Sequence, residues 1–305
     1  MNRLILFDVL RPGRNILLLD SRLILVIVLS LTGPLSVKVE AQSNSSKIKI
    51  PFELTRGRMY VQTFVNEQGP FRFLVDTGAS GIGRADTSLV KDLGLRLAGT
   101  TQNFDGVSSS TVDTVTIASL RIGPLTQRNV QLISRNYNAG RSPESKIING
   151  IIGDAFFANY LWTLDYKKQE IVLSKGVLQA SDAGVVRYDD SFVVPLRIGE
   201  FEAVGAFDTG STLEMHLPIE WAKRLKIETL RDAGEGRRAN TIFKLFSAEL
   251  PVAVNIGGNK INRTAAHFSE LAPNINIGGL FLANNKCVIT FDQKNRLIKI
   301  RCSEK

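Results

Sequence analysis

Two acidic segments repeat in this chain of 305 residues. Residues 76–80 (DTGAS) return 132 residues later as residues 208–212 (DTGST), and an apolar run precedes each copy. Two carboxylates held about 3 Å apart cannot both ionise cheaply, so they share one proton. One member of such a pair can take a proton from water while the other polarises a carbonyl group. The repeat therefore points to acid–base chemistry wherever a fold brings Asp76 and Asp208 together.

Other kinds of site find little support. The two histidines, His216 and His267, have no His, Cys or Glu at metal-ligand spacing, so we expect no metal site and place both on the surface or in loops. Residues 78–81 lack the spacing of a nucleophile elbow, and no phosphate-binding loop occurs. The net charge is +9, but the basic residues are scattered. We therefore expect no nucleic-acid partner and regard these residues as a solvated surface, with mild attraction to anionic cell-envelope surfaces as the alternative.

The repetition continues beyond the acidic loops. A helical pattern follows each loop at the same offset. Residues 151–159 (IIGDAFFAN) resemble residues 276–284 (NIGGLFLAN), and residues 164–173 resemble residues 291–300 at a similar offset. A period near 130 residues is too long for a solenoid and fits two homologous units.

These features resemble the aspartic proteases of the pepsin and retropepsin superfamily, over nearly the whole chain after residue 47. The closest likeness is to bacterial two-lobed retropepsin-like aspartyl proteases. The resemblance implies a mostly β, bilobal pepsin-like fold, with two homologous β-barrel-like lobes, a cleft between them and a monomer with internal pseudo-two-fold symmetry. The lobes would span residues 48–175 and 192–305, joined by the polar segment 176–191. The implied activity is that of an endopeptidase acting on peptide or protein substrates, with no metal and no cofactor.

The resemblance also assigns roles to residues of the two loops. Asp76 and Asp208 would be the catalytic pair, with a water molecule between them. Threonines that bond the opposite loop, glycines at a tight turn and one hydroxyl would support the pair: Thr77, Gly78, Thr209, Gly210 and Ser211. Ser211 can donate a hydrogen bond to Asp208, whereas Ala79 cannot do so for Asp76, so we expect Asp76 to be the weaker acid and the activity optimum to be mildly acidic to near neutral. Asn276 departs from the family pattern, which usually has an apolar residue there.

A polar, Ser-rich hairpin after the first loop is the candidate flap over the cleft. Residues 99–117 contain no tyrosine, the residue expected at the flap in this family, and the nearest equivalents are Phe104, Asp105 and Gly106. Such a hairpin can cover a cleft and exclude water, but it cannot donate a phenolic hydrogen bond. The alternative function is therefore a non-catalytic peptide-binding module that kept the fold and both loops.

The first 41 residues have the order of a secretory signal: basic residues, a short apolar core and a cleavage-like Val39-Glu40-Ala41. The core is shorter than the about 20 apolar residues that span a bilayer. We predict a signal peptide over residues 1–41 and an exported protein, periplasmic or secreted, with no membrane contact after cleavage. The alternative is a retained anchor over residues 16–37, with the protein facing the outside.

The two cysteines, Cys287 and Cys302, flank a predicted hairpin whose turn lies at residues 293–296. Pairing Asp292 with Leu297 places the cysteines directly opposite each other on adjacent strands. An oxidising compartment favours a disulfide between them. The alternative is a pair of buried free thiols.

Between the two ends the pattern predicts many short strands and few helices. The predicted strands span residues 58–65, 71–75, 112–117, 130–133, 171–173, 192–196, 250–256 and 297–301. The clearest predicted helices span residues 87–93 and 218–225, the second with Pro218 in its first turn.

Overall fold

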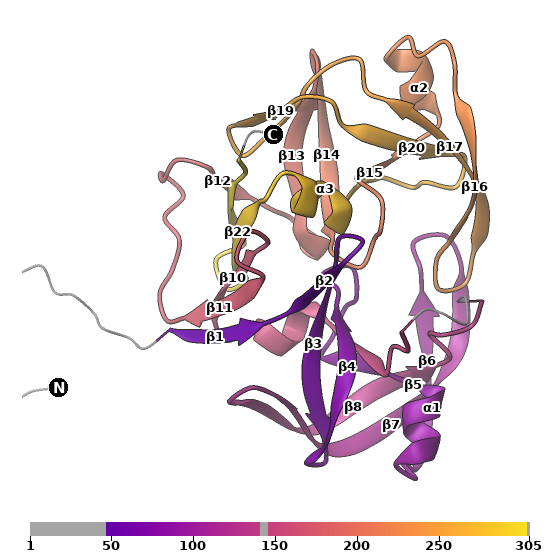
Figure 1. Cartoon of the computed structure of the whole chain (residues 1–305), viewed down its shortest axis with the longest axis vertical. Helices are drawn as coiled ribbons and strands as arrows, with labels where there is room; N and C mark the ends of the chain where they lie inside the picture. The colour runs from indigo at the N-terminus through magenta and orange to yellow at the C-terminus, as the bar shows by residue number, and fades with distance from the viewer. Residues whose placement is uncertain (1–46, 141–145, 304–305) are drawn as a thin grey trace, which may run out of the picture. The chain divides into compact units, whose positions relative to one another are not determined.

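A computed structural model describes residues 47–140 and 146–303 of the chain (Figure 1). The predicted signal peptide over residues 1–41 lies outside the described residues. The part that is described is mostly β, as predicted. None of the helices in this part has both the length and the apolar character needed to cross a membrane.

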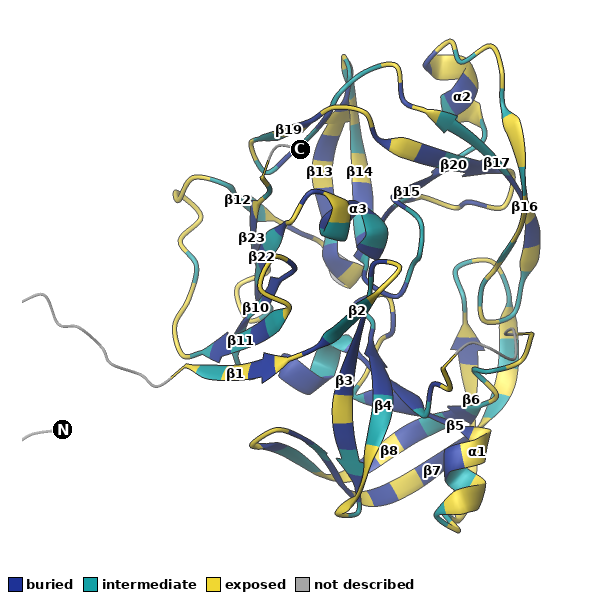
Figure 2. Ribbon diagram, viewed as in Figure 1, coloured by how far each residue is buried: buried dark blue, intermediate teal, exposed yellow. Residues whose placement is uncertain are grey.

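An eight-stranded sheet contains most of the first repeat. Buried and exposed side chains alternate along its longest strands, so one face packs on the core while the other meets solvent (Figure 2). In spatial order the strands are β2 (Glu53–Thr55), β3 (Arg58–Val65), β4 (Gln68–Val75), β9 (Gly150–Ile152), β5 (Gly83–Asp86), β8 (Leu125–Arg135), β7 (Ser109–Ile122) and β6 (Leu97–Phe104). The helix α1 (Thr87–Asp92) and the 3-10 turn η1 (Asp154–Phe157) follow β5 and β9.

A nine-stranded sheet contains most of the second repeat. In spatial order its strands are β16 (Arg231–Arg237), β17 (Ile242–Glu249), β20 (Ala265–Ser269), β15 (Met215–Pro218), β21 (Ile275–Gly278), β14 (Phe201–Asp208), β13 (Val193–Ile198), β18 (Val254–Ile256) and β19 (Asn259–Ile261). The helices α2 (Glu220–Arg224) and α3 (Gly279–Asn284) follow β15 and β21.

The two sheets share one pairing scheme. In the first, β4 runs parallel to β9, β9 antiparallel to β5, and β5 parallel to β8. In the second, β14 runs parallel to β21, β21 antiparallel to β15, and β15 parallel to β20. The hairpins β6–β7 and β16–β17 then extend the two sheets in the same way. The internal repeat of the sequence is thus also a repeat of strand topology.

A third sheet of six strands is shared by both repeats. Its central contact is the antiparallel pairing of β10 from the first repeat with β22 from the second. In spatial order its strands are β1 (Ile48–Pro51), β11 (Glu170–Ser174), β10 (Leu161–Asp165), β22 (Val288–Asp292), β23 (Leu297–Arg301) and β12 (Val185–Arg187). The segment 176–191, predicted as a connection, therefore contributes a strand, β12, and part of the 3-10 turn η2 (Asp190–Phe192).

Aromatic side chains also join the repeats at this sheet. Trp162 is buried and stacks on Phe157 of its own repeat and on Phe291 of the second, with ring centroids 5.1 and 4.3 Å away. Its indole N–H donates to Gln293 Oε1 at 3.1 Å. Large aromatics contribute much of the apolar area that a core buries, so this cluster holds the two repeats together.

Two predicted elements are wrong in part. The strand predicted over residues 250–256 covers only Val254–Ile256, because Pro251 has no backbone N–H for a sheet. The helix predicted from Pro218 begins at Glu220, since Pro218 still belongs to β15 and Ile219 N donates to Ser269 O at 3.0 Å.

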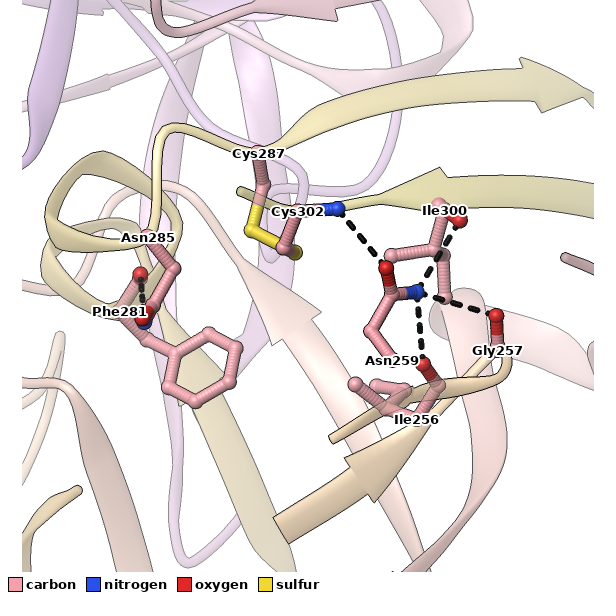
Figure 3. The surroundings of a disulfide bond; sticks show 8 residues. All are labelled: Ile256, Gly257, Asn259, Phe281, Asn285, Cys287, Ile300 and Cys302. Atoms are coloured by element: carbon pink, nitrogen blue, oxygen red, sulfur yellow. Dashed lines mark hydrogen bonds between the residues drawn. A yellow bond between two sulfur atoms is a disulfide. The ribbon is translucent and has the colours of Figure 1, made fainter. Parts of the chain in front are cut away.

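Cys287 and Cys302 form a disulfide across the last hairpin, as predicted (Figure 3). Asp292 pairs with Leu297, and the ladder runs back to Val288 opposite Arg301, one step before the cysteines. Asn259, the first residue of β19, secures the end of the hairpin. Its amide donates to the carbonyl oxygens of Ile256, Gly257 and Ile300, and its Oδ1 accepts from Cys302 N at 2.9 Å.

Candidate active site

Strands β4 and β14 each lead directly into an acidic loop. Asp76 follows the last residue of β4, and Asp208 is the last residue of β14. A short buried strand lies parallel to each of them, β9 beside β4 and β21 beside β14. Asp76 N donates to Ile152 O at 3.0 Å, and Asp208 lies opposite Gly278. The sheets thus fix the start of both loops.

The two loops interlock through their threonines. Thr77 N donates to Thr209 Oγ1 and Thr209 N to Thr77 Oγ1, both at 3.1 Å. Each hydroxyl in turn donates across the interface at 2.8 Å, Thr77 to Phe207 O and Thr209 to Val75 O. Both threonines are buried, where a polar group must be hydrogen-bonded to avoid a large desolvation cost. The four bonds hold the loops in one arrangement.

The glycines leave room for the two carboxylates to approach each other. A Cβ placed on Gly78 would lie 3.2 Å from both Asp76 Oδ1 and Asp208 Oδ1, so these oxygens are separated by no more than twice that distance. A Cβ on Gly210 would lie 2.5 Å from Asp76 Cγ, which is too close for a side chain. Gly78 N donates to Asp76 at 2.8 Å and Gly210 N to Asp208 at 3.0 Å.

The surroundings of Asp76 disfavour its charge. Burial and then the neighbouring carboxylate Asp208 raise the pKa of Asp76 to about 7. Arg84, the backbone N–H of Gly78 and Arg58 oppose this rise without cancelling it. Arg84 is buried and donates to Ser80 O at 3.1 Å, and Arg58 Nε donates to Gly210 O. Asp76 therefore holds a proton in mildly acidic solution.

Asp208 receives a side-chain hydrogen bond that Asp76 lacks. Asn276 Nδ2 donates to Asp208 Oδ2 at 2.9 Å, while among the described residues Asp76 accepts only from Gly78 N. Ser211, expected to donate to Asp208, instead accepts from Leu213 N at 3.2 Å, and its bond to Asp208 stays a prediction. The residue that departs from the family pattern is thus in direct contact with the acidic pair.

The candidate flap is bonded to a second hairpin that sequence analysis missed. The turn of β6–β7 contains Asp105 and Gly106, and the turn of β16–β17 lies beside it (Figure 1). Asp105 Oδ2 accepts from Asn240 N at 2.7 Å and from the Thr241 hydroxyl at 3.0 Å. Asn240 Nδ2 donates to Asn103 O and Ser108 O, at 2.8 and 2.9 Å. Phe104 is largely exposed at the end of β6.

Two charged side chains, Asp105 and Arg238, also connect these hairpin tips. Burial alone would raise the pKa of Asp105, but hydrogen bonds from the Ser108, Asn240 and Val107 amides and from Thr241 outweigh it and lower that pKa. Arg238 Nη1 donates to Asp105 O at 3.4 Å and approaches the Cβ position of Gly106 to 3.0 Å. Gly106 and Val107 also line a shallow depression whose other wall is formed by residues 270–273.

Both histidines differ from the expectation that they lie on the surface or in loops. They stand opposite each other on β15 and β20, and His216 is buried. His216 stacks on Phe243 and its Nε2 lies 2.8 Å from Ser269 Oγ. Burial, with smaller contributions from Arg238 and His267, lowers the pKa of His216 to about 4. His216 is thus neutral at ordinary pH, and its role is in packing.

A small apolar cluster lies beside the first acidic loop. Leu74 and Ala79 flank Asp76 in sequence, and they pack with the buried residues Tyr60, Ile148 and Ile151. Tyr137 packs against this cluster, and burial raises the pKa of its hydroxyl to about 12. The cluster is separate from the main core and places apolar surface next to Asp76.

Comparison with known proteins gives one family. A family model described as aspartyl protease matches residues 61–156, which contain the first acidic loop, the β6–β7 hairpin and β9. The second acidic loop lies outside this match and is related to it by the internal repeat. No curated protein matches the chain.

Proposed function

The match over residues 61–156 supports an aspartic protease superfamily, and from this premise we propose that the protein is an aspartic endopeptidase in which Asp76 and Asp208 activate water. The reciprocal bonding of Thr77 and Thr209 is the observation that carries the proposal, because it joins two loops 132 residues apart around a pair of carboxylates. Two neighbouring carboxylates that repel each other are costly to a fold, which favours a catalytic use over a structural one.

The chemistry needs only these two carboxyl groups and water. The ionised member takes a proton from a water molecule as the water oxygen attacks the peptide carbonyl carbon. The protonated member polarises the carbonyl oxygen, and a proton then passes to the leaving amine. Because burial and Asp208 raise the pKa of Asp76 to about 7, the singly protonated pair persists into the mildly acidic to neutral range.

The fold that goes with this function is bilobal. The matching pairing schemes of the eight- and nine-stranded sheets support two homologous lobes, with the acidic loops between them. The facing tips of β6–β7 and β16–β17 support a cover over this site built from both lobes. The substrate would be an extended peptide segment beneath the two hairpins, next to the apolar cluster around Leu74 and Ile151.

An exported location accompanies the proposal. A disulfide such as Cys287–Cys302 persists in oxidising compartments and is rare in the cytosol. N-terminal sequencing of the purified protein tests the predicted cleavage after Ala41. An intact N-terminus on membrane-bound protein would favour the anchor instead.

Cleavage of a peptide library by purified protein tests the function. Asp76→Asn and Asp208→Asn should each lower turnover by roughly 10²- to 10⁴-fold, because an amide can neither accept the proton of water nor share one. The double variant should be little worse than either single variant, since the residues act as one unit. Asp113→Asn, an exposed carboxylate on β7, is the matched control and should keep full activity.

Two results would decide against the proposal. Substantial activity in either single variant would remove the pair from the mechanism. Binding of peptides and of a statine-type inhibitor without any cleavage would identify a non-catalytic peptide-binding module.

A further inference from the structure

Asn276 occupies the position that Ile151 holds in the first repeat. Ile151 on β9 lies opposite Leu74, and Asn276 on β21 lies opposite Ala206. Leu74 and Ala206 each stand two residues before the aspartate of an acidic loop. At this position beside the acidic loops, the first repeat therefore has an apolar side chain and the second has an amide.

This amide gives the two carboxyl groups unequal surroundings. Both oxygens of Asp208 accept a hydrogen bond, Oδ2 from Asn276 Nδ2 at 2.9 Å and Oδ1 from Gly210 N at 3.0 Å. Asp76 accepts one such bond from the described residues, from Gly78 N at 2.8 Å. A hydrogen bond donated to a carboxylate favours its charged form, so the negative charge is better placed on Asp208.

The orientation of the Asn276 amide agrees with this distribution. With Nδ2 toward Asp208, Asn276 Oδ1 is buried and has no hydrogen-bond partner among the described residues. A buried acceptor without a partner is unfavourable, so its cost must be offset by the bond that Nδ2 makes. Reversing the amide would set Oδ1 against a carboxylate oxygen, which is repulsive unless Asp208 is protonated. In this orientation the amide gives Asp208 Oδ2 a hydrogen-bond donor.

We propose that Asn276 is a positioning residue that keeps the negative charge of the pair on Asp208 and the shared proton on Asp76. This inference rests on the proposed function. Asp208 then takes the proton of the attacking water, while the carboxyl proton of Asp76 moves toward the substrate carbonyl oxygen. When the C–N bond breaks, Asp208 gives its proton to the leaving amine nitrogen. Asp76 recovers its proton as the carbonyl C=O re-forms, so both groups return to their starting states.

Several other charged or titratable groups face the pair, and none of them is itself altered by a substitution at Asn276. Arg58 and Arg84 favour the charged form of Asp76, and Arg238 lies within electrostatic reach of Asp208. His216, opposite Asn276 on β15, is neutral above about pH 4, and burial raises the pKa of Tyr166, which is also neutral. A shift that follows substitution of Asn276 alone can therefore be assigned to its amide.

The test is the pH dependence of kcat/KM for Asn276→Ile, which copies the first repeat. Loss of the donor should raise the pKa at which the singly charged pair forms, so the acidic limb should move toward neutral pH by about one unit. Asn276→Leu, close to asparagine in shape, serves as a second variant in case isoleucine disturbs folding. Asn274→Ala, exposed in the same segment, is the control and should keep the wild-type profile.

A second measurement does not depend on turnover. Carbon NMR of the aspartate carboxyl groups, assigned with Asp76→Asn and Asp208→Asn, should show Asp208 charged where Asp76 is still protonated. In Asn276→Ile this difference should shrink.

The outcomes separate this inference from the proposed function. A wild-type protein that cleaves no peptide would overturn the function and this assignment together. An active wild-type enzyme whose Asn276→Ile and Asn276→Leu profiles coincide with its own would overturn the role of Asn276 alone. Loss of activity at all pH values without a shift of the limb would reduce Asn276 to a structural part of the loop.

Discussion

Asp76 is a partly exposed acid whose proton is lost late. Its pKa is raised from 3.8 to about 7, first by burial and then by the charge of Asp208. Over the interval between these values the folded chain retains a proton that the unfolded chain has released. This proton therefore contributes its full stabilisation below the ordinary carboxyl pKa. The free energy of unfolding falls as the pH rises toward 7.

From this sign we predict that Asp76→Asn stabilises the fold while it strongly lowers cleavage. The amide has no proton to lose and does not repel Asp208. The melting temperature of the variant should exceed that of the wild-type protein at about pH 8 and approach it at about pH 4. Thermal unfolding followed by circular dichroism at several pH values measures this difference. If the melting temperatures of the two proteins changed with pH in parallel, the pKa of Asp76 would not be raised in the folded protein.

Residue roles differ in how far the sequence could predict them. The acidic loops were identifiable because the two copies align without a gap. Their chemistry also needs two carboxylates, which the repeat supplies. Asn276 was visible only as a departure from a pattern, since nothing in the sequence places its amide beside Asp208. The expected bond from Ser211 to Asp208 could not be fixed from the sequence, because the Ser211 hydroxyl instead accepts from Leu213 N. Arg58 and Arg84 gave no signal, because lone arginines are common on surfaces.

At the scale of elements, the two hairpin tips form a latch, which we define as the hydrogen bonds between residues 103–110 and residues 238–241. The Asn240 side chain is its centre. It donates to Asn103 O and Ser108 O and accepts from Ser110 Oγ at 2.7 Å and from Arg135 Nη1. Arg135 also donates to Ala239 O. These bonds hold the two hairpin tips together.

Asn240→Ala should therefore release the latch without unfolding the sheets. We expect hydrogen exchange of the amides of residues 103–110 to quicken by roughly tenfold or more, as for a local opening that costs about 1.4 kcal/mol less. Mass spectrometry of peptides from exchanged protein measures this, and Asn159→Ala, an exposed asparagine far along the chain, is the control. Unchanged exchange at 103–110 would mean that other contacts keep the tips closed.

The latch should also respond to acid through Asp105. Because the pKa of Asp105 is lowered in the folded protein, its bonds are present above the ordinary carboxyl pKa and are lost as the pH falls through the lowered value. Exchange at residues 103–110 should thus rise in strongly acidic solution. In Asp105→Asn it should be raised already at neutral pH and change less on acidification.

The last hairpin carries a separate prediction. The disulfide closes a loop of 15 residues, for which the chain-entropy estimate is about 3 kcal/mol. Cys287→Ser with Cys302→Ser should lower the melting temperature and leave peptide cleavage intact, because neither cysteine contacts the acidic loops. Mass spectrometry of unreduced protein should show the two cysteines linked. Equal melting temperatures before and after reduction would contradict a stabilising bond.

At the scale of the whole molecule, the shared six-stranded sheet is what sequence analysis failed to foresee. The predicted boundaries place β1, β10 and β11 in one lobe and β22 and β23 in the other, yet these strands form one sheet. The sequence predicted strands at β11, β22 and β23 but not their partners, because pairing across repeats leaves no local signal. The short central strands β5, β9, β15 and β21 were missed for a related reason. They have three or four residues and are largely buried, so they show no alternation.

We predict that this sheet keeps the two repeats together after the chain is cut between them. A protease site inserted in the largely exposed segment 177–183 allows such a cut in folded protein. The pairing of β10 with β22 and the stacking of Trp162 on Phe291 should hold both pieces in one particle. Size-exclusion chromatography after cleavage checks this, with uncut protein as the reference. Separate elution of the pieces under native conditions would show that the connection itself is required.

The reciprocal bonds of Thr77 and Thr209 bear on a difference between one chain with two repeats and a pair of identical chains. Each threonine offers the other the same donor and acceptor, so two copies of one repeat could in principle interlock through the same contacts. In such a symmetric assembly every neighbour of one carboxylate is repeated at the other, and the two acids are equal. Joining the repeats in one polypeptide removes that equality. Position 151 can remain isoleucine while position 276 becomes asparagine, and the acid and the base can then evolve independently.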